Sequence, residues 1–353
     1  MIALFETDYR NIERYYLVHD KINKEFVDDN VIILFESKSQ IKPFKKKYKN
    51  SRCISLTELE TVEYNHLIIN GNRIPDIYVS IITKQKNIPI TYIQHGPHSI
   101  HMIRSKSFFI SNLKKTLRYL FYCFKIYKLT KKTKLFITLI LKNTKGGSRV
   151  NKSLKLYTPN FSYVYSEFYK KWHIENYFGL DTEYYLLRNR DNIFKPTKKQ
   201  KALVFCYQTL VEDGRIDPKI FFKNLDKIKE FAENRSLKPI IKSHPRMSLA
   251  NRKFLSEEGW EIFDSKTKIP VGHITVGYYS SLLSLWAFYM SPVISIKINN
   301  HYTPDEVSSY CFSIEINQLK NFDINVKNEI LKQRSERVDF LFNYSGKEKL
   351  RLD

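Results

Sequence analysis

The 353-residue sequence lacks several features that commonly mark a functional site. It contains neither a GxGxxG sequence nor a Walker-type loop, which excludes the usual glycine-rich phosphate-binding turns. The first charged side chain is already at Glu6, and no long apolar run follows, so we expect no signal peptide. The cysteines are far apart and form no CxxC or Cys/His cluster, which indicates reduced thiols and excludes a structural zinc site. They are Cys53, Cys123, Cys206 and Cys311.

Acidic residues are missing from one long stretch of the chain. Asp and Glu are absent between Asp76 and Glu167, whereas the same stretch carries 17 Lys and Arg in a chain of net charge +23. A localised basic field needs an anionic partner, such as an anionic membrane, a nucleic acid or a polyanionic substrate. The apolar runs Tyr119–Phe124 and Leu135–Leu141 within this stretch fall short of the ~18–20 residues of a membrane span.

Lysine recurs every few positions through residues 102–155. This pattern predicts one or two amphipathic helices that lie on an anionic bilayer, with aromatic residues inserted and cations reaching the headgroups. The cations expected to bind the membrane are Lys114, Lys115, Arg118, Lys131 and Lys132. The alternative is a solvated basic helix packed on its own domain. We expect no nucleic-acid partner, because no known binding motif occurs here.

The length of the chain suits two domains better than a single core. Short apolar runs alternate with helix-like stretches, which predicts an α/β fold with parallel sheets covered by helices. The polar, proline-containing stretch 195–201 predicts the boundary between two Rossmann-type doubly wound domains, at 1–194 and 195–353. The expected strands are Ile2–Phe5, Val31–Phe35, Arg52–Ser55, Tyr64–Ile69, Ile90–Ile93, Phe161–Ser166, Glu183–Leu187, Ala202–Tyr207, Pro239–Lys242, Trp260–Phe263, His273–Val276 and Val293–Ile296.

Polar residues follow an expected strand in the first half, at Gln94, His95, Gly96 and His98. Ligands of open α/β sheets bind at the carboxyl ends of strands, so these residues are candidates for the acceptor side of a site. A histidine at such a position suits general-base catalysis, because its pKa lies near working pH. The alternatives are a histidine that only structures the turn, or a metal site that includes His101. The spacing lacks a carboxylate or cysteine partner, so we expect no metal.

Two segments in the second half place phosphate-binding groups after strands. Lys242, His244, Pro245 and Arg246 crowd the end of one strand and supply cationic and imidazole donors. Tyr279, Ser280 and Ser281 follow another strand and open an apolar helix, where a serine N-cap and free N–H groups favour an anion. The alternative for the first segment is a solvated turn. For the second segment, it is a helix cap that binds no ligand.

A further strand end in the second half carries Gln208, followed by Glu212, Asp213 and Gly214. Gln208 is expected beside the donor. The acidic pair is either a catalytic base or a solvated turn before the next helix, and we favour the turn.

Together, the His-Gly, His-Pro and Ser-Ser elements resemble bacterial GT-B transferases of surface-polymer synthesis, whose two domains face a cleft. The segment from Ser166 to Tyr169 and the segment Leu187–Asp191 also look like the stretch that precedes the second domain in this group. The nearest families are the CDP-glycerol glycerophosphotransferases, although Pro97 and His98 replace the usual Thr-Pro. Bacterial sialyltransferases are similar in combining an acidic-acidic-Gly motif with His-Pro and a serine pair.

The resemblance implies that His95 is the base and that the His-Pro and Ser-Ser elements hold the phosphates of a CMP- or CDP-linked donor. We therefore expect an inverting, metal-independent glycosyltransferase of capsule, lipopolysaccharide or related glycan synthesis. It would need no cofactor and would act on a glycan or lipid-linked acceptor at the cytoplasmic face of the membrane. The alternatives are a CDP-glycerol or CDP-ribitol phosphotransferase, and a non-catalytic protein that binds membranes or polyanions.

Overall fold

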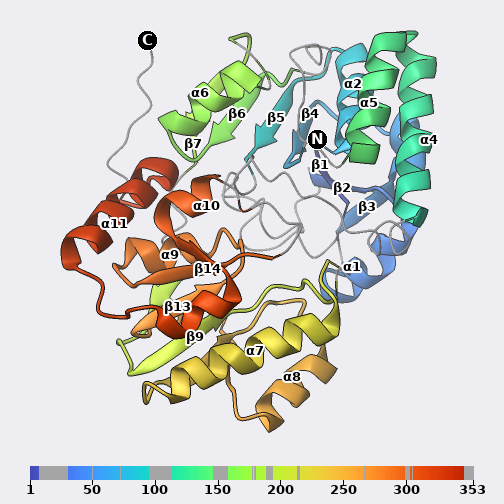
Figure 1. Cartoon of the computed structure of the whole chain (residues 1–353). Coiled ribbons are helices and arrows are strands. Elements are labelled where there is room, and N and C mark those ends of the chain that lie inside the picture. The colour runs from blue at the N-terminus through green and yellow to red at the C-terminus, as the bar shows by residue number, and fades with distance from the viewer. Residues whose placement is uncertain are drawn as a thin grey trace. The chain divides into compact units, whose positions relative to one another are not determined.

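A computed structural model shows the chain as two compact units, each built on its own parallel sheet (Figure 1). Among the described residues, the first unit lies within 1–94 and 114–187, and the second comprises Leu113 and residues within 194–345. The structure describes residues 1–7, 31–49, 51–71, 73–94, 113–145, 158–176, 178, 180–187, 194–212, 215–265, 268–298, 303 and 305–345.

The sheet of the first unit has the order β3-β2-β1-β4-β5-β6-β7, and each neighbouring pair is parallel. Its central strands are short runs of β-branched and aromatic residues that are buried on both faces, as parallel strands covered by helices must be. The strands are β1 (Ile2–Glu6), β2 (Val31–Phe35), β3 (Arg52–Ser55), β4 (His66–Ile69), β5 (Ile90–Ile93), β6 (Phe161–Val164) and β7 (Glu183–Leu186). The order reverses between β1 and β4, so a ligand site is expected at the carboxyl ends of these two strands.

The helices of the first unit include two from the basic segment, as predicted. The helices are α1 (Ile41–Lys47), α2 (Ile74–Gln85), α4 (Leu113–Thr130), α5 (Thr133–Lys145) and α6 (Glu167–Asn176). In Figure 1, α4 and α5 lie beside α2 as an outer layer. Tyr122 of α4 packs on Tyr78 of α2 with ring centroids 5.3 Å apart, and Leu135 and Leu139 of α5 join the same core. No helix in the described part of the chain is both long and apolar enough to span a bilayer.

The second unit repeats this topology. Its sheet has the order β11-β10-β9-β13-β14-β15, all parallel. Its strands are β9 (Ala202–Cys206), β10 (Lys238–Lys242), β11 (Glu261–Phe263), β13 (Ile274–Gly277), β14 (Val293–Ile296) and β15 (Phe312–Ile314). Its helices are α7 (Pro218–Glu233), α8 (Leu249–Glu257), α9 (Leu283–Phe288), α10 (Asp305–Tyr310) and α11 (Asn328–Phe342). A separate core forms around Phe205, Phe221 and Tyr278.

The structure confirms the predicted α/β class with two Rossmann-like parallel-sheet units. The polar stretch 195–201, predicted as the domain boundary, contributes the strand β8 (Lys195–Pro196), which pairs with β12 (Lys268–Ile269), and both strands belong to the second unit.

Candidate functional site

The second unit has its topological switch point at the carboxyl ends of β9 and β13. β9 lies between β10 and β13, and the chain fills the sheet on one side of β9 before it crosses to the other. The loops that follow these strands therefore diverge and leave room for a ligand at this edge of the sheet. Next-nearest strands of a sheet are about 10 Å apart, so one ligand of nucleotide size can reach the loops after both β10 and β13.

The loop after β9 connects the two predicted phosphate-binding segments. Gln208 accepts a hydrogen bond from the backbone N–H of Tyr279 through its Oε1, at 3.1 Å. Thr209 accepts one from Arg246 Nη2 through its Oγ1, at 2.9 Å. Three of the residues selected from the sequence, Gln208, Arg246 and Tyr279, are thus brought together, and Thr209, which contacts Arg246, was not among the selected residues.

His244, Pro245 and Arg246 form a tight turn directly after β10. The backbone N–H of Met247 donates to the carbonyl of His244 at 2.9 Å, which closes the turn. The backbone N–H of Arg246 donates to His244 Nδ1 at 3.1 Å. In the neutral ring this bond places the proton on Nε2, so the imidazole presents a hydrogen-bond donor.

Lys242 is buried at the end of β10, and its ammonium is engaged within the unit. Its Nζ donates to the carbonyl of Ser265 at 2.7 Å and to that of Ser243 at 3.4 Å. Burial lowers the pKa of Lys242, while Cys206 and Asp264 oppose the shift. Hydrogen bonds from Arg252 and Ser243 lower the pKa of Asp264. The structure therefore shows Lys242 fixing the loop after β11, and its contact with a donor stays a prediction.

The Tyr279–Ser281 segment follows β13 and leads into α9. The expected serine N-cap is wrong in detail: α9 begins at Leu283 with Leu282 as its N-cap, and Ser280 Oγ accepts from the N–H of Leu282 at 3.2 Å. The serine thus stabilises the turn before the helix. A Cβ at Gly277 would lie 2.9 Å from Cδ2 of Leu283, so a larger residue here would require the Leu283 side chain to shift.

Glu212 is a hydrogen-bond acceptor that joins two loops. Its Oε1 accepts from the Tyr207 hydroxyl at 2.8 Å, from Asn251 Nδ2 at 3.0 Å and from the backbone N–H of Ser248 at 3.2 Å. These bonds tie the loop after β9 to the start of α8. Tyr207 and Asn251 were not singled out from the sequence, because nothing in the spacing of their positions relates them. Asp213, the other member of the acidic pair, lies outside the described residues.

In the first unit, the structure describes only one of the predicted acceptor-side residues. Gln94 is buried after β5, where its Oε1 accepts from the N–H of Tyr165 at 3.0 Å and its own N–H donates to Tyr163 O at 2.9 Å. It locks the ends of β5 and β6 together. His95, Gly96 and His98 lie outside the described residues, so the base remains a prediction.

A charged network that the sequence analysis missed occupies the switch point of the first unit. Glu6 ends β1 with a fully buried side chain, and it accepts from Asn70 Nδ2 at 2.6 Å and from Arg73 Nη1 at 3.0 Å. Arg73 also forms a two-point pair with Asp76, at 2.6 and 2.9 Å, and donates to Thr7 Oγ1 at 2.5 Å and Asn70 Oδ1 at 3.2 Å. The sequence does offer one signal for this network, because the acidic residue Glu6 stands at the end of an otherwise apolar strand.

The cations predicted to bind a membrane divide into two groups. Arg118 lies 2.8 Å from the buried carboxylate of Glu36, so it is engaged within the first unit. Lys131 and Lys132 are exposed at the connection between α4 and α5. Lys114 and Lys115 belong to α4, but their side chains lie outside the described part of the structure. No group of three or more potential metal ligands occurs among the described residues.

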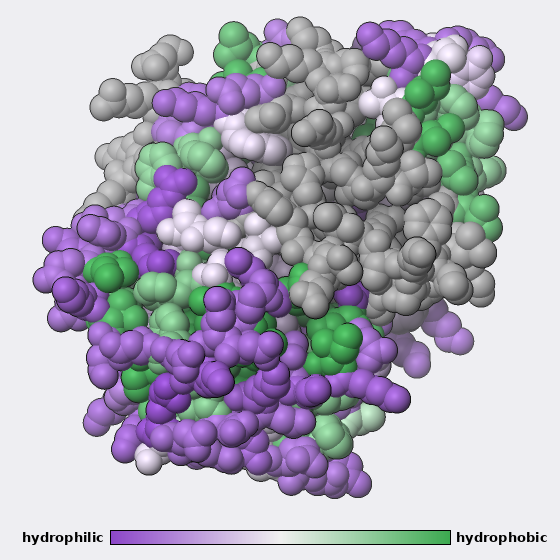
Figure 2. Space-filling view, viewed as in Figure 1, coloured by the Kyte–Doolittle hydropathy of each residue, from purple (hydrophilic) through white to green (hydrophobic). Residues whose placement is uncertain are grey.

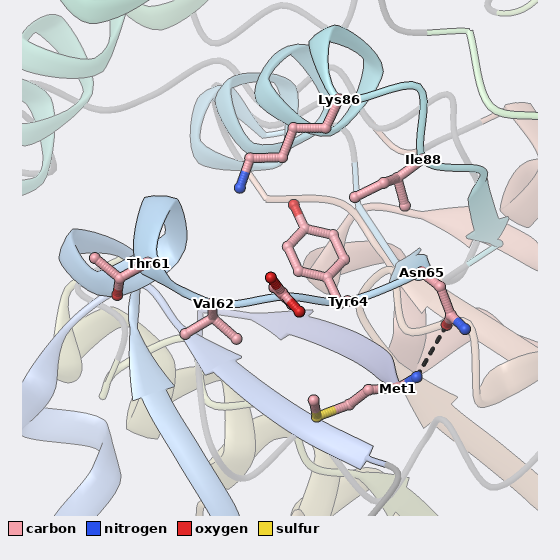
Figure 3. Close-up of a pocket in the computed structure, with 8 residues that line it drawn as sticks. Met1, Thr61, Val62, Tyr64, Asn65, Lys86 and Ile88 are labelled. Atoms are coloured by element: carbon pink, nitrogen blue, oxygen red, sulfur yellow. Dashed lines mark hydrogen bonds between the residues drawn. The ribbon is translucent and has the colours of Figure 1, made fainter.

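An open groove of about 670 Å³ lies at the other edge of the sheet in the first unit (Figure 3). Met1, Asn65 and Ile88, which precede β1, β4 and β5, line it together with Tyr64 and Lys86. The N-terminal ammonium donates to Asn65 Oδ1 at 3.1 Å, and Lys86 Nζ lies 5.7 Å from the Tyr64 ring centroid. The groove contains none of the predicted site residues and lies at the amino ends of its strands.

Comparison with known proteins identifies the fold. No protein family and no curated protein matches the sequence. Among solved structures, a putative UDP-N-acetylglucosamine 2-epimerase from Listeria monocytogenes matches 98% of this chain and 93% of its own length, with 10% identity and a TM-score of 0.52. The UDP-GlcNAc 2-epimerase from Neisseria meningitidis matches 98% of this chain and 97% of its own length, with 13% identity and a TM-score of 0.45.

The wall teichoic acid polymerase TagF also matches, over 98% of this chain and 85% of its own length, with 10% identity and a TM-score of 0.43. Of these three structures, only the Listeria protein exceeds a TM-score of 0.5. The chain thus has the paired Rossmann-like domains of a GT-B-type fold. At 10% identity, this likeness shows the fold and nothing of the reaction.

Proposed function

We propose that the chain is a GT-B-type glycosyltransferase whose second unit binds the phosphates of a nucleotide-activated donor. One observation carries the proposal: the loop after β9 bonds both to Arg246 of the His-Pro-Arg turn and to Tyr279 of the Ser-Ser segment, at one switch point. Ligands of doubly wound sheets bind at this position. The Listeria protein that shares the fold is named for a nucleotide sugar, which supports a donor of this class.

The side chains at the switch point suit a leaving phosphate. Arg246 offers a guanidinium, His244 an Nε2–H donor, and the backbone at Ser280 and Ser281 further N–H groups. Donors fixed before the reaction stabilise charge that develops on a leaving group, and they need no metal to do so. The turn hydrogen bonds that hold His244 and Ser280 supply this preorganisation.

The reaction itself depends on the first unit. We propose that His95 accepts the proton of an acceptor hydroxyl, which attacks the donor directly and inverts its configuration. The resemblance of the His-Gly, His-Pro and Ser-Ser elements to surface-polymer transferases favours a CMP- or CDP-linked donor. It also favours an acceptor in capsule, lipopolysaccharide or related glycan synthesis, and attachment to the cytoplasmic face of the bacterial membrane.

Steady-state kinetics with a screen of CMP- and CDP-linked donors tests the proposal. His244→Ala is expected to lower kcat by about 100- to 1000-fold, as the loss of one preorganised donor does elsewhere. His273→Ala is the matched control: His273 precedes β13 at the other edge of the same sheet, where its Nδ1 contacts Gln200 O at 2.9 Å. Equal rates for the two variants would refute the role of His244. If the protein turns over CDP-glycerol or CDP-ribitol but no sugar donor, its activity is polyol-phosphate transfer and not glycosyl transfer.

A further inference from the structure

Helix α4 has two apolar faces, and the core of the first unit uses only one of them. Tyr119, Tyr122, Cys123 and Ile126 are buried in the cluster that includes α2. On the opposite face, the exposed fractions are 57% for Leu117, 56% for Phe121 and 54% for Phe124. Their spacing of four and three residues aligns these three side chains in one stripe along the helix. Figure 2 shows the hydrophobic surface that runs over α4.

Helix α5 packs beside this stripe and carries a further exposed apolar residue. The Phe124 ring packs on Phe136 of α5 with centroids 5.0 Å apart, and Ile137 of α5 is 52% exposed. Single exposed apolar residues are ordinary on a protein surface, but a row of three on one helix, with another on the helix that packs against it, marks an interaction surface. We call Leu117, Phe121, Phe124 and Ile137 the apolar stripe.

The charges around the apolar stripe identify its partner. Neither α4 nor α5 contains an Asp or Glu. Lys128, Lys131, Lys132 and Lys134 are exposed on the two helices or the turn between them, and Lys125 Nζ lies 4.9 Å from the centroid of the Phe121 ring. A second copy of this chain would bring like charges together. An anionic lipid surface offers both an apolar layer and phosphate groups.

We propose that the α4–α5 hairpin is a membrane-docking element, with the apolar stripe inserted into the headgroup boundary of an anionic bilayer and the lysines bound to lipid phosphates. The proposal deepens the membrane attachment proposed above and rests on it for its biological setting. It does not depend on the donor or on the chemistry. Binding then has two parts, an apolar part that resists salt and an electrostatic part that salt weakens.

Sedimentation of the full-length protein with vesicles tests both parts. The vesicles are phosphatidylcholine alone or mixed with phosphatidylglycerol. Phe121→Ser/Phe124→Ser is expected to lower partitioning into the anionic vesicles by about 30-fold at both low and high salt. Lys131→Gln/Lys132→Gln is expected to lower it by about 25-fold at low salt, about fivefold per cation, and much less at 1 M salt. Lys198→Gln/Lys199→Gln, an exposed lysine pair in the second unit, is the control and should bind as wild type does.

Wild-type partitioning by the Phe121→Ser/Phe124→Ser variant would overturn the proposal. So would a wild-type dimer in sedimentation velocity that this variant abolishes, because the stripe would then bind a second copy. Leu117→Ser/Phe121→Ser provides a second variant that leaves the Phe124–Phe136 contact in place, and melting curves check that each variant folds. Turnover of a soluble donor and acceptor should be unchanged in all of them, so failure of docking and failure of the proposed function give different results.

Discussion

At the scale of single residues, the hydrogen bonds of Glu212 bear on two interpretations of a short motif. The acidic pair Glu212 and Asp213 was compatible with a catalytic base or with a turn. In the structure, one oxygen of Glu212 takes three hydrogen bonds from Tyr207, Asn251 and Ser248. A carboxylate used in this way positions the turn beside His244. We infer that Glu212 is a positioning residue.

Substitutions of Glu212 separate these roles. Glu212→Gln keeps an acceptor oxygen and should retain most of the transferase activity, because the loops stay joined. Glu212→Ala leaves three donors without their acceptor and should lower the free energy of unfolding by about 1–3 kcal/mol. Denaturant titrations and steady-state rates measure the two effects. A fully folded Glu212→Gln variant without activity would instead identify Glu212 as the base.

At the scale of elements, the positions of the strands could be predicted from the sequence far better than the side-chain contacts made by the residues that follow them. The strands β2, β3, β5 and β14 have the predicted bounds. In β2, β5 and β14, a run rich in β-branched residues and buried on both faces leaves little choice of position. Helix α8 was missed. It buries only Leu255 and leaves Leu249 82% exposed, so its apolar pattern is weak.

The same limit applies to the candidate site. The sequence placed Gln208, His244 and Ser280 after strands, and therefore at one edge of a sheet. It could not show that Arg246 is bonded to Thr209, since such contacts depend on which strands are neighbours. Nor could it reveal the network around Arg73. Its two acids, Glu6 and Asp76, come from elements that are far apart in the chain.

Arg73 holds the first switch point together, and its loss should be costly. All five of its side-chain N–H groups have acceptors, and two of these acceptors are the buried carboxylates of Glu6 and Asp76. Arg73→Met removes the cation that pairs with both buried acids and should destabilise the first unit by about 3–5 kcal/mol. Hydrogen exchange measured on peptides from β1 and β4 reports this change.

The exposed Arg52 on β3 supplies the control for that experiment. Arg52→Met should change stability by about 0.5 kcal/mol or less. If exchange in β1 and β4 were equal in the two variants, the Arg73 network would not be what stabilises these strand ends.

At the scale of the whole molecule, the two units share a topology and differ in chemistry. Both sheets start in the middle, extend to one side and then cross to the other, so each has a switch point at the ends of its first and fourth strands. The first switch point holds Glu6 and Asp76 around Arg73. The second lies beside His244 and Arg246 and has a serine-rich turn. Among the described residues, the first switch point is lined by buried acids and the second by the His-Pro-Arg turn, which supports placing the proposed nucleotide site at the second.

Nucleotide binding tests this assignment most directly. The measurement is a thermal-shift panel of CMP, CDP, UDP and GDP on wild-type protein and Arg246→Ala. At 100 times its dissociation constant, a bound nucleotide adds about 2.7 kcal/mol to stability, which raises the melting temperature by several degrees. We expect a cytidine nucleotide to produce this shift in wild type. We expect Arg246→Ala to lower its affinity about tenfold or more, because a charge-assisted hydrogen bond is lost. No shift with any nucleotide, or an equal shift in Arg246→Ala, would contradict a phosphate site at the ends of β9, β10 and β13.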